Sequence, residues 1–107
     1  MRRVVVTGLG FITSIGNSRA GVLKSLKETI TGIEIFDQLQ KPEIPVKLAG
    51  TIKGFTFPTA RPDDWTIPES YNIPRDQLRS MSPNCVYGVC AMAQAIREAE
   101  LTAEMIS

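Results

Sequence analysis

Histidine is absent from this sequence of 107 residues, and cysteine occurs only twice. Histidine is the commonest general base, the commonest metal ligand and the usual partner of a catalytic serine or cysteine. A chain without histidine cannot supply those roles itself. Long hydrophobic runs are also missing, because Val4 to Val6 is far shorter than the apolar region of a signal peptide or a membrane span. We therefore expect a cytoplasmic chain without a membrane partner.

The chain has little excess charge of either sign, with a formal net charge of +1 at pH 7. So small a charge creates no overall field that attracts nucleic acid, and any electrostatic partner must be recognised by a local cluster. We expect no nucleic-acid partner. The composition is 43% hydrophobic and 21% charged, which is typical of one soluble globular domain with a modest core.

The two cysteines lie five residues apart in one predicted helix, where Cys85 and Cys90 point roughly 140° away from each other. They cannot pair with each other, and we expect reduced thiols. Cys90 is remote from any group that would lower its pKa, whereas Cys85 lies nearer the helix start. We interpret both as small buried hydrophobic residues, and the lone C-x4-C spacing does not predict a zinc site.

Hydrophobic patterning predicts strands that alternate with helices. The first expected element is a buried strand over Arg3 to Thr7. A helix follows, which is capped by Asn17 or Ser18, ends at Gly32 and has Val22, Leu23, Leu26 and Ile30 on its apolar face. Strands are expected over Ile33 to Phe36 and Val46 to Lys53, and a long helix from Ser82 to about Ala99. The long helix has a wide apolar face, so we expect it to be buried with partners on several sides.

Residues 55–74 contain four prolines, which is too many for a regular element. We expect an ordered surface excursion within one domain that covers residues 1–107, without a domain boundary. Trp65 and Tyr71 in this stretch are expected to anchor it to the core.

The turn Gly8-Leu9-Gly10 follows the first predicted strand, as in many dinucleotide-binding domains. The third small residue of that fingerprint would be at position 13, where this chain has Thr13, and the helix begins late, near Ser18. Glu34 lies at a plausible distance to bind a ribose. A small nucleotide-binding, Rossmann-like domain is therefore an alternative, although we predict no cofactor.

A basic pair, Arg75 and Arg79, lies at i and i+4 on one side of a short helical turn before the long helix. Both side chains should face outward. The pair is either an ordinary solvated face or a docking patch for a phosphate or an acidic partner, because arginine forks suit both ligands.

Short motifs run through nearly the whole chain: R-R-V-V-V-T-G-L-G at 2–10, G-N at 16–17, V-L-K-S-L at 22–26, T-G-I at 31–33, L-A-G-T-I-K at 48–53, R-S-M-S at 79–82 and A-M-A-Q-A-I-R-E-A-E-L at 91–101. In this order they resemble the N-terminal portion of the β-ketoacyl-[acyl-carrier-protein] synthases, condensing enzymes of the thiolase-like superfamily. Residues 55–74 look longer than is usual there. The resemblance implies an α/β chain, the N-terminal part of a thiolase-like αβαβα fold with a mixed sheet and a long buried helix.

The resemblance also implies a function, a homodimer and a partner. Members of the family are acyltransferases that condense an acyl group, held on an enzyme cysteine, with malonyl-carrier protein in fatty-acid or polyketide synthesis. Their nucleophilic cysteine and two histidines lie beyond this chain, and neither Cys85 nor Cys90 matches the nucleophile's motif. We therefore expect roughly the first quarter of a synthase, with no catalytic residue and no activity alone.

One family site maps onto this chain. Arg75 and Arg79 match basic residues that contact the acidic acyl carrier protein in relatives, although Asp76 stands where relatives can carry a base. Carrier-protein binding by this pair is therefore expected, and a non-catalytic carrier-protein interaction module is a further alternative.

Overall fold

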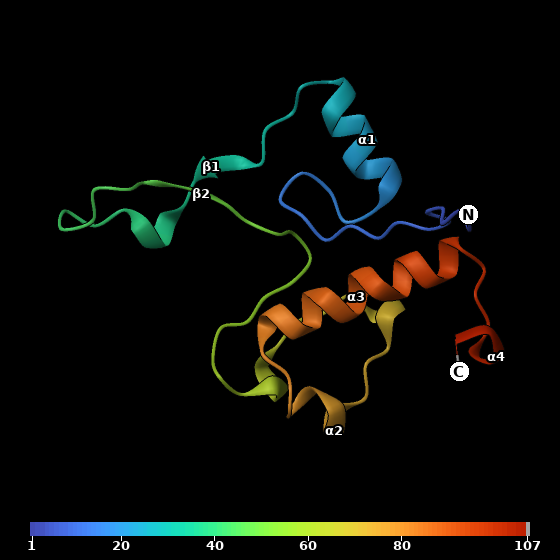
Figure 1. Cartoon of the computed structure of the whole chain (residues 1–107). Helices are drawn as coiled ribbons and strands as arrows, with labels where there is room; N and C mark the ends of the chain where they lie inside the picture. Colours follow the sequence, from blue (N-terminus) through green and yellow to red (C-terminus); the bar gives the residue numbers. More distant parts are fainter. Residues whose placement is uncertain (107) are drawn as a thin grey trace.

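The computed structural model describes residues 1–106, which fold into helices around one long helix, with a small antiparallel ribbon beside them (Figure 1). The elements in chain order are α1 (Arg19–Lys27), β1 (Ile33–Ile35), the 3-10 turn η1 (Asp37–Leu39), β2 (Leu48–Gly50), the 3-10 turns η2 (Pro62–Asp64) and η3 (Glu69–Tyr71), α2 (Arg75–Leu78), α3 (Pro83–Glu98) and α4 (Ala103–Ile106). Among the described residues, no helix combines the length and the apolar character needed to cross a bilayer.

Helix α3 forms as its cap predicts. The Ser82 side chain accepts a hydrogen bond from the Cys85 N–H, and a proline occupies the first turn. Val86 and Cys90 are fully buried, but Met92 is 61% exposed. The prediction of a helix buried on several sides is therefore wrong for one face, because no described element covers it.

Helix α1 begins as predicted, with the Ser18 hydroxyl accepting a hydrogen bond from the Gly21 N–H at 3.0 Å. Its predicted end at Gly32 is wrong. The helix stops at Lys27 because Thr29 takes a left-handed conformation, with φ of 57°, and lets the next N–H reach back to a carbonyl of the last turn. Leu26, which belongs to the predicted apolar face of this helix, is exposed.

The strand predicted for Arg3 to Thr7 is not formed. No backbone hydrogen bond joins residues 2–8 to any other described residue, and Val4, Val5 and Val6 are 95%, 74% and 77% exposed. A strand needs a neighbour for its backbone groups, and the two described strands pair only with each other. A β-branched sequence alone does not supply that neighbour.

The strands β1 and β2 form an antiparallel ribbon with Ile33 opposite Gly50 and Ile35 opposite Leu48. Both strands lie within their predicted ranges. The ribbon extends away from α3 in Figure 1, and its apolar side chains Ile33, Ile35 and Leu48 are exposed. The described sheet is therefore smaller than the mixed sheet that the resemblance implies.

The core lies where residues 55–74 fold against α3. Phe55, Leu78, Val86 and Cys90 form its buried centre. Aromatic rings pack around this centre. The ring centroids of Phe55 and Tyr87 lie 5.3 Å apart in an edge-to-face arrangement, and those of Phe57 and Trp65 lie 5.0 Å apart. Trp65 and Tyr71 pack against this cluster, as expected of residues that anchor a long segment.

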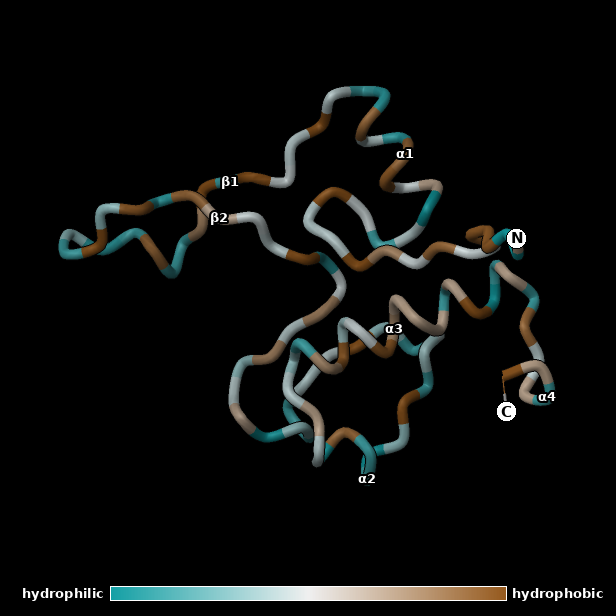
Figure 2. Tube along the Cα trace, viewed as in Figure 1, coloured by the Kyte–Doolittle hydropathy of each residue, from teal (hydrophilic) through white to brown (hydrophobic). Residues whose placement is uncertain are grey.

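The molecule is more extended than its length predicts. Its radius of gyration is 16.9 Å, whereas a compact domain of this length has about 13 Å. Its accessible surface is 8441 Å², whereas a folded monomer of this mass exposes about 5,900 Å². The chain therefore exposes a surplus of about 2,500 Å². Hydrophobic segments contribute to it at the N-terminus and along the ribbon (Figure 2).

Candidate functional site

The basic pair predicted from the sequence lies on α2 and its end. Leu78, which is buried, fixes this single turn against the core. The backbone N–H of Arg79 donates to the carbonyl of Arg75 at 3.2 Å, so the two residues follow each other on one side of the turn. Both arginines are exposed, in agreement with their predicted orientation.

The charges around this turn are mixed. An oxygen of Asp63 lies 3.6 Å from the guanidinium of Arg75, with both side chains more than half exposed. Asp76 is exposed on the same turn. Within the described part of the chain, Arg79 makes no ion pair. Arg79 is therefore the cation of the pair that is free to meet an anionic partner.

An open groove of about 620 Å³ borders Arg75. Trp65, Ile67 and Ile73 give it apolar walls, whereas Asp63 and Arg75 bring charge to it. Such a surface can hold an anionic or amphipathic group by contact and charge. It contains no histidine or cysteine, so it offers neither of the usual groups for proton transfer or nucleophilic attack.

The two cysteines lie in different surroundings. Burial raises the pKa of the Cys90 thiol, which suits its predicted role as a small hydrophobic residue. Cys85 is exposed, and the prediction of burial is wrong there because no element of residues 1–106 covers its side of α3. A hydrogen bond from the Ser82 side chain to the Cys85 sulfur at 3.4 Å is the main cause that lowers its pKa. Over residues 1–106, no group of three or more potential ligands is placed to hold a metal ion.

The glycines of the opening turn pack against α3. A Cβ at Gly8 would overlap the carbonyl oxygen of Ala95, and one at Gly10 would overlap that of Ala91. Only a residue without a side chain allows the two backbones to come so close. These contacts support a packing role for both glycines rather than a place for a pyrophosphate.

Sequence reasoning missed Gln94, which joins α3 to two distant segments. Its side-chain oxygen accepts a hydrogen bond from the Phe11 N–H at 3.0 Å. Its side-chain nitrogen lies 3.2 Å from the Phe11 carbonyl oxygen, 2.6 Å from that of Asn17 and 2.6 Å from the Tyr71 hydroxyl. The available signal was a single amide between two alanines on a helix that is otherwise apolar at this point.

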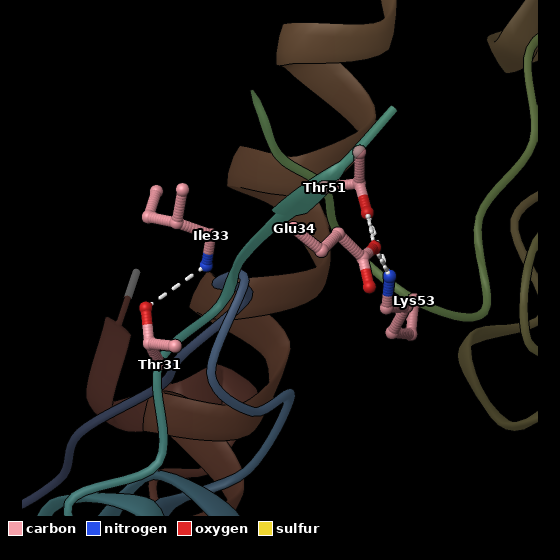
Figure 3. Close-up of polar contacts among 5 residues, drawn as sticks. All are labelled: Thr31, Ile33, Glu34, Thr51 and Lys53. Atoms are coloured by element: carbon pink, nitrogen blue, oxygen red, sulfur yellow. Dashed lines mark hydrogen bonds and ion pairs between the residues drawn. The ribbon is translucent and has the colours of Figure 1, made fainter. Parts of the chain in front are cut away.

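Glu34, considered as a ribose ligand, is engaged within the ribbon (Figure 3). Its carboxylate accepts hydrogen bonds from Thr51, at 2.8 Å, and from the ammonium of Lys53. These bonds, with that from Lys53 as the largest cause, lower the pKa of Glu34. Thr31 braces the start of β1 by accepting from the Ile33 N–H at 3.1 Å. The carboxylate therefore cross-links the ribbon.

The chain is an α/β segment in which the long helix α3 packs against residues 55–74. The exposed charged turn α2 lies just before this helix in the chain. Residues 1–107 match the family described as "Beta-ketoacyl synthase, N-terminal domain". The chain belongs to the β-ketoacyl synthase family.

Named relatives agree with this assignment. The chain is 36% identical to 3-oxoacyl-[acyl-carrier-protein] synthase 1 of Haemophilus influenzae over 107 residues, which are 100% of this chain and 23% of the relative. It is 36% identical to the synthase 1 of Buchnera aphidicola subsp. Baizongia pistaciae, over 98% of this chain and 23% of the relative. It is 33% identical to the synthase 1 of Escherichia coli K12, over 97% of this chain and 22% of the relative. The chain thus spans less than a quarter of their length. No solved structure matches it.

Proposed function

We propose that this chain supplies the N-terminal part of a β-ketoacyl-acyl-carrier-protein synthase, which condenses an acyl group with malonyl-carrier protein in fatty-acid synthesis. The observation that carries the proposal is the family match over all of residues 1–107. Named relatives that share this region are 3-oxoacyl-acyl-carrier-protein synthases. The packing of Gly8, Gly10 and Gln94 on α3 supports a scaffold role for the segment.

The chain alone is inactive in this proposal. It has no histidine to stabilise a developing oxyanion, and Cys90 is buried with a raised pKa. Cys85 is exposed but has no histidine partner. The test is a condensation assay with the purified chain, acyl-carrier protein and malonyl-carrier protein, followed by mass spectrometry for acylated cysteine. We expect neither product nor adduct, and malonyl-dependent condensation would contradict the proposal.

Arg75 and Arg79 form part of the carrier-protein docking surface in this proposal. Support comes from the exposure of both side chains and from the free charge of Arg79. We expect the chain to bind an acidic carrier protein weakly and more weakly as salt rises, because exposed charges are screened. Reversal of both charges, Arg75→Glu with Arg79→Glu, should reduce the affinity at least tenfold in a calorimetric titration.

A charge-matched control is available on α1. Lys24 and Lys27 are exposed and lie near the end of that helix. The double variant Lys24→Glu/Lys27→Glu changes the net charge by the same amount at a different place. If both double variants lose affinity equally, or if the unmodified chain does not bind, Arg75 and Arg79 are not a docking site.

A non-catalytic carrier-binding module is the second candidate, favoured by the same free charge at Arg79. Complementation separates it from the scaffold role. The chain is mixed with a relative that lacks the matched N-terminal region, and condensation is measured. A scaffold restores activity to the shortened enzyme, whereas a module binds carrier protein without restoring it.

For the complete enzyme we propose a homodimer in the cytoplasm, with acyl carrier protein as its partner. Support comes from the family and from relatives named for the carrier protein. Sedimentation of the complete enzyme tests the homodimer, and fractionation of the cell tests the cytoplasmic location.

A further inference from the structure

The side-chain nitrogen of Gln94 has more hydrogen-bond acceptors around it than it can serve. A side-chain amide nitrogen carries two hydrogens. The carbonyl oxygens of Phe11 and Asn17 and the hydroxyl oxygen of Tyr71 all lie within hydrogen-bond distance of it, in partly buried surroundings. One of these three acceptors is therefore always without a hydrogen from Gln94.

The oxygen of the same amide fixes the direction in which the group points. It accepts a hydrogen bond from the Phe11 N–H at 3.0 Å. Rotation of the amide by half a turn would direct its hydrogens toward that N–H and its oxygen toward two carbonyl oxygens, so that like groups would face each other. The nitrogen of Gln94 therefore stays on the side of its acceptors.

The acceptors belong to two segments on different sides of α3 (Figure 1). Residues 11–17 supply two carbonyl oxygens, one for each amide hydrogen, and neither accepts another hydrogen bond from the described residues. Tyr71, at the end of the turn η3, supplies the third acceptor. Its oxygen lies 2.6 Å from the Gln94 nitrogen, as close as that of Asn17 and closer than that of Phe11 at 3.2 Å. Tyr71 is thus placed to take a hydrogen that residues 11–17 would otherwise receive.

We propose that Gln94 couples these two segments in opposition. When the Tyr71 hydroxyl takes a hydrogen, α3 holds residues 11–17 by one bond fewer, and when Tyr71 moves away, that hold tightens. Helix α2 begins at Arg75, four residues after Tyr71, so a displacement of the charged turn would alter the attachment of the N-terminal segment. The contacts lie within the chain, so the proposal depends neither on what covers its surface nor on the function proposed above.

A supporting role for Tyr71 is the opposite interpretation. Hydrogen bonds in a chain polarise and strengthen one another, so the hydroxyl could reinforce the bonds of Gln94 rather than compete with them. The two interpretations predict changes of opposite sign when the hydroxyl is removed. The sign of that change is therefore the decisive measurement.

The first test is hydrogen exchange at the Phe11 amide, which donates to Gln94, in the intact chain and in Tyr71→Phe. The variant keeps the ring, whose centroid lies 6.4 Å from that of Phe55. Rates are taken relative to the amide of Cys90 in the buried core, so that a change in overall stability cancels. We expect exchange at Phe11 to slow about three- to fivefold, because residues 11–17 regain one hydrogen bond of ordinary net value. Faster or unchanged exchange would overturn the proposal.

A matched control is available in the same cluster. Tyr87 also packs on Phe55, at 5.3 Å between ring centroids, and its hydroxyl makes no hydrogen bond to the described residues. Tyr87→Phe therefore removes the same atom without releasing a hydrogen of Gln94, and exchange at Phe11 should not change. Equal slowing in the two tyrosine variants would also overturn the proposal.

The second test repeats Tyr71→Phe in a Gln94→Leu background, where the shared nitrogen is absent. The hydroxyl then has nothing to compete for, so its removal should leave exchange at Phe11 as it is in Gln94→Leu alone. The same slowing with and without Gln94 would place the effect in the packing of the ring and refute the coupling. If Gln94→Leu does not fold, the comparison of Tyr71→Phe with Tyr87→Phe decides the question by itself.

Discussion

Replacement of Gln94 by leucine tests whether one amide holds the N-terminal segment on α3. The two hydrogens of its nitrogen can serve two of three nearby acceptors at a time, and its oxygen accepts one bond from Phe11. The side chain therefore makes the equivalent of three hydrogen bonds, each with a net value of about 1 kcal/mol. Because the site is only partly buried, water replaces some of this, and we expect Gln94→Leu to cost about 2–3 kcal/mol.

Hydrogen exchange at the Phe11 amide measures this loss directly, because the amide donates to Gln94. A cost of 2–3 kcal/mol corresponds to exchange about 30 to 150 times faster. The control is Arg97→Leu, at an exposed position on the same helix, which should change stability by less than about 0.5 kcal/mol. Unchanged exchange at Phe11 in Gln94→Leu, or equal acceleration in both variants, would refute the reasoning.

Three further predictions concern packing, pH and thiol reactivity. Gly10→Ala should destabilise the chain by about 1–3 kcal/mol in urea unfolding, because its Cβ would lie 2.7 Å from a carbonyl carbon of α3. Gly88→Ala has open space and should stabilise α3 by up to about 1 kcal/mol. The hydrogen bond from the Leu9 N–H is the main cause that lowers the pKa of Glu98 below 4.5. Its stabilisation is therefore full above about pH 4.5 and is lost as pH falls through the folded pKa, a dependence that Glu98→Gln should flatten. One thiol, that of the exposed Cys85, should react rapidly with a disulfide reagent, whereas buried Cys90 should react only on unfolding.

Each of these three predictions has an outcome that would contradict it. Equal effects of alanine at Gly10 and Gly88 would mean that the close approach to α3 is not formed. A pH dependence unchanged by Glu98→Gln would mean that its carboxylate is not held in the folded chain. Two rapid thiols in the folded state would place Cys90 outside the core.

The helix starts could be predicted because their determinants are local. Ser18 and Ser82 each cap an N–H three residues further on, so the sequence around the cap contains the whole interaction. The end of α1 could not be predicted in the same way. Thr29 adopts a left-handed conformation that usually indicates glycine, and the expected stop at Gly32 followed that preference.

The candidate site shows the same division between local and distant determinants. The i and i+4 spacing of Arg75 and Arg79 was enough to predict that both face outward. Spacing could not reveal that Asp63, twelve residues earlier, pairs with Arg75, or that Gln94 reaches Phe11 across 83 residues. The strand expected at Arg3 to Thr7 failed for a related reason, because its formation depends on a neighbour and not on its own residues.

During synthesis of the chain, the hydrogen bond from the Leu9 N–H to Glu98 can form only after Glu98 has been made. The two residues are 89 positions apart, so the anchor of the N-terminal segment is made long after the segment itself. At about 5–20 residues per second, a ribosome needs roughly 4 to 18 s for that interval. During this time Gly8 and Gly10 are without the stretch of α3 on which they pack, and Arg2 and Arg3 flank the three valines as charges that oppose aggregation. The nascent chain therefore carries an apolar, β-branched segment for that whole interval before its anchor on α3 can form.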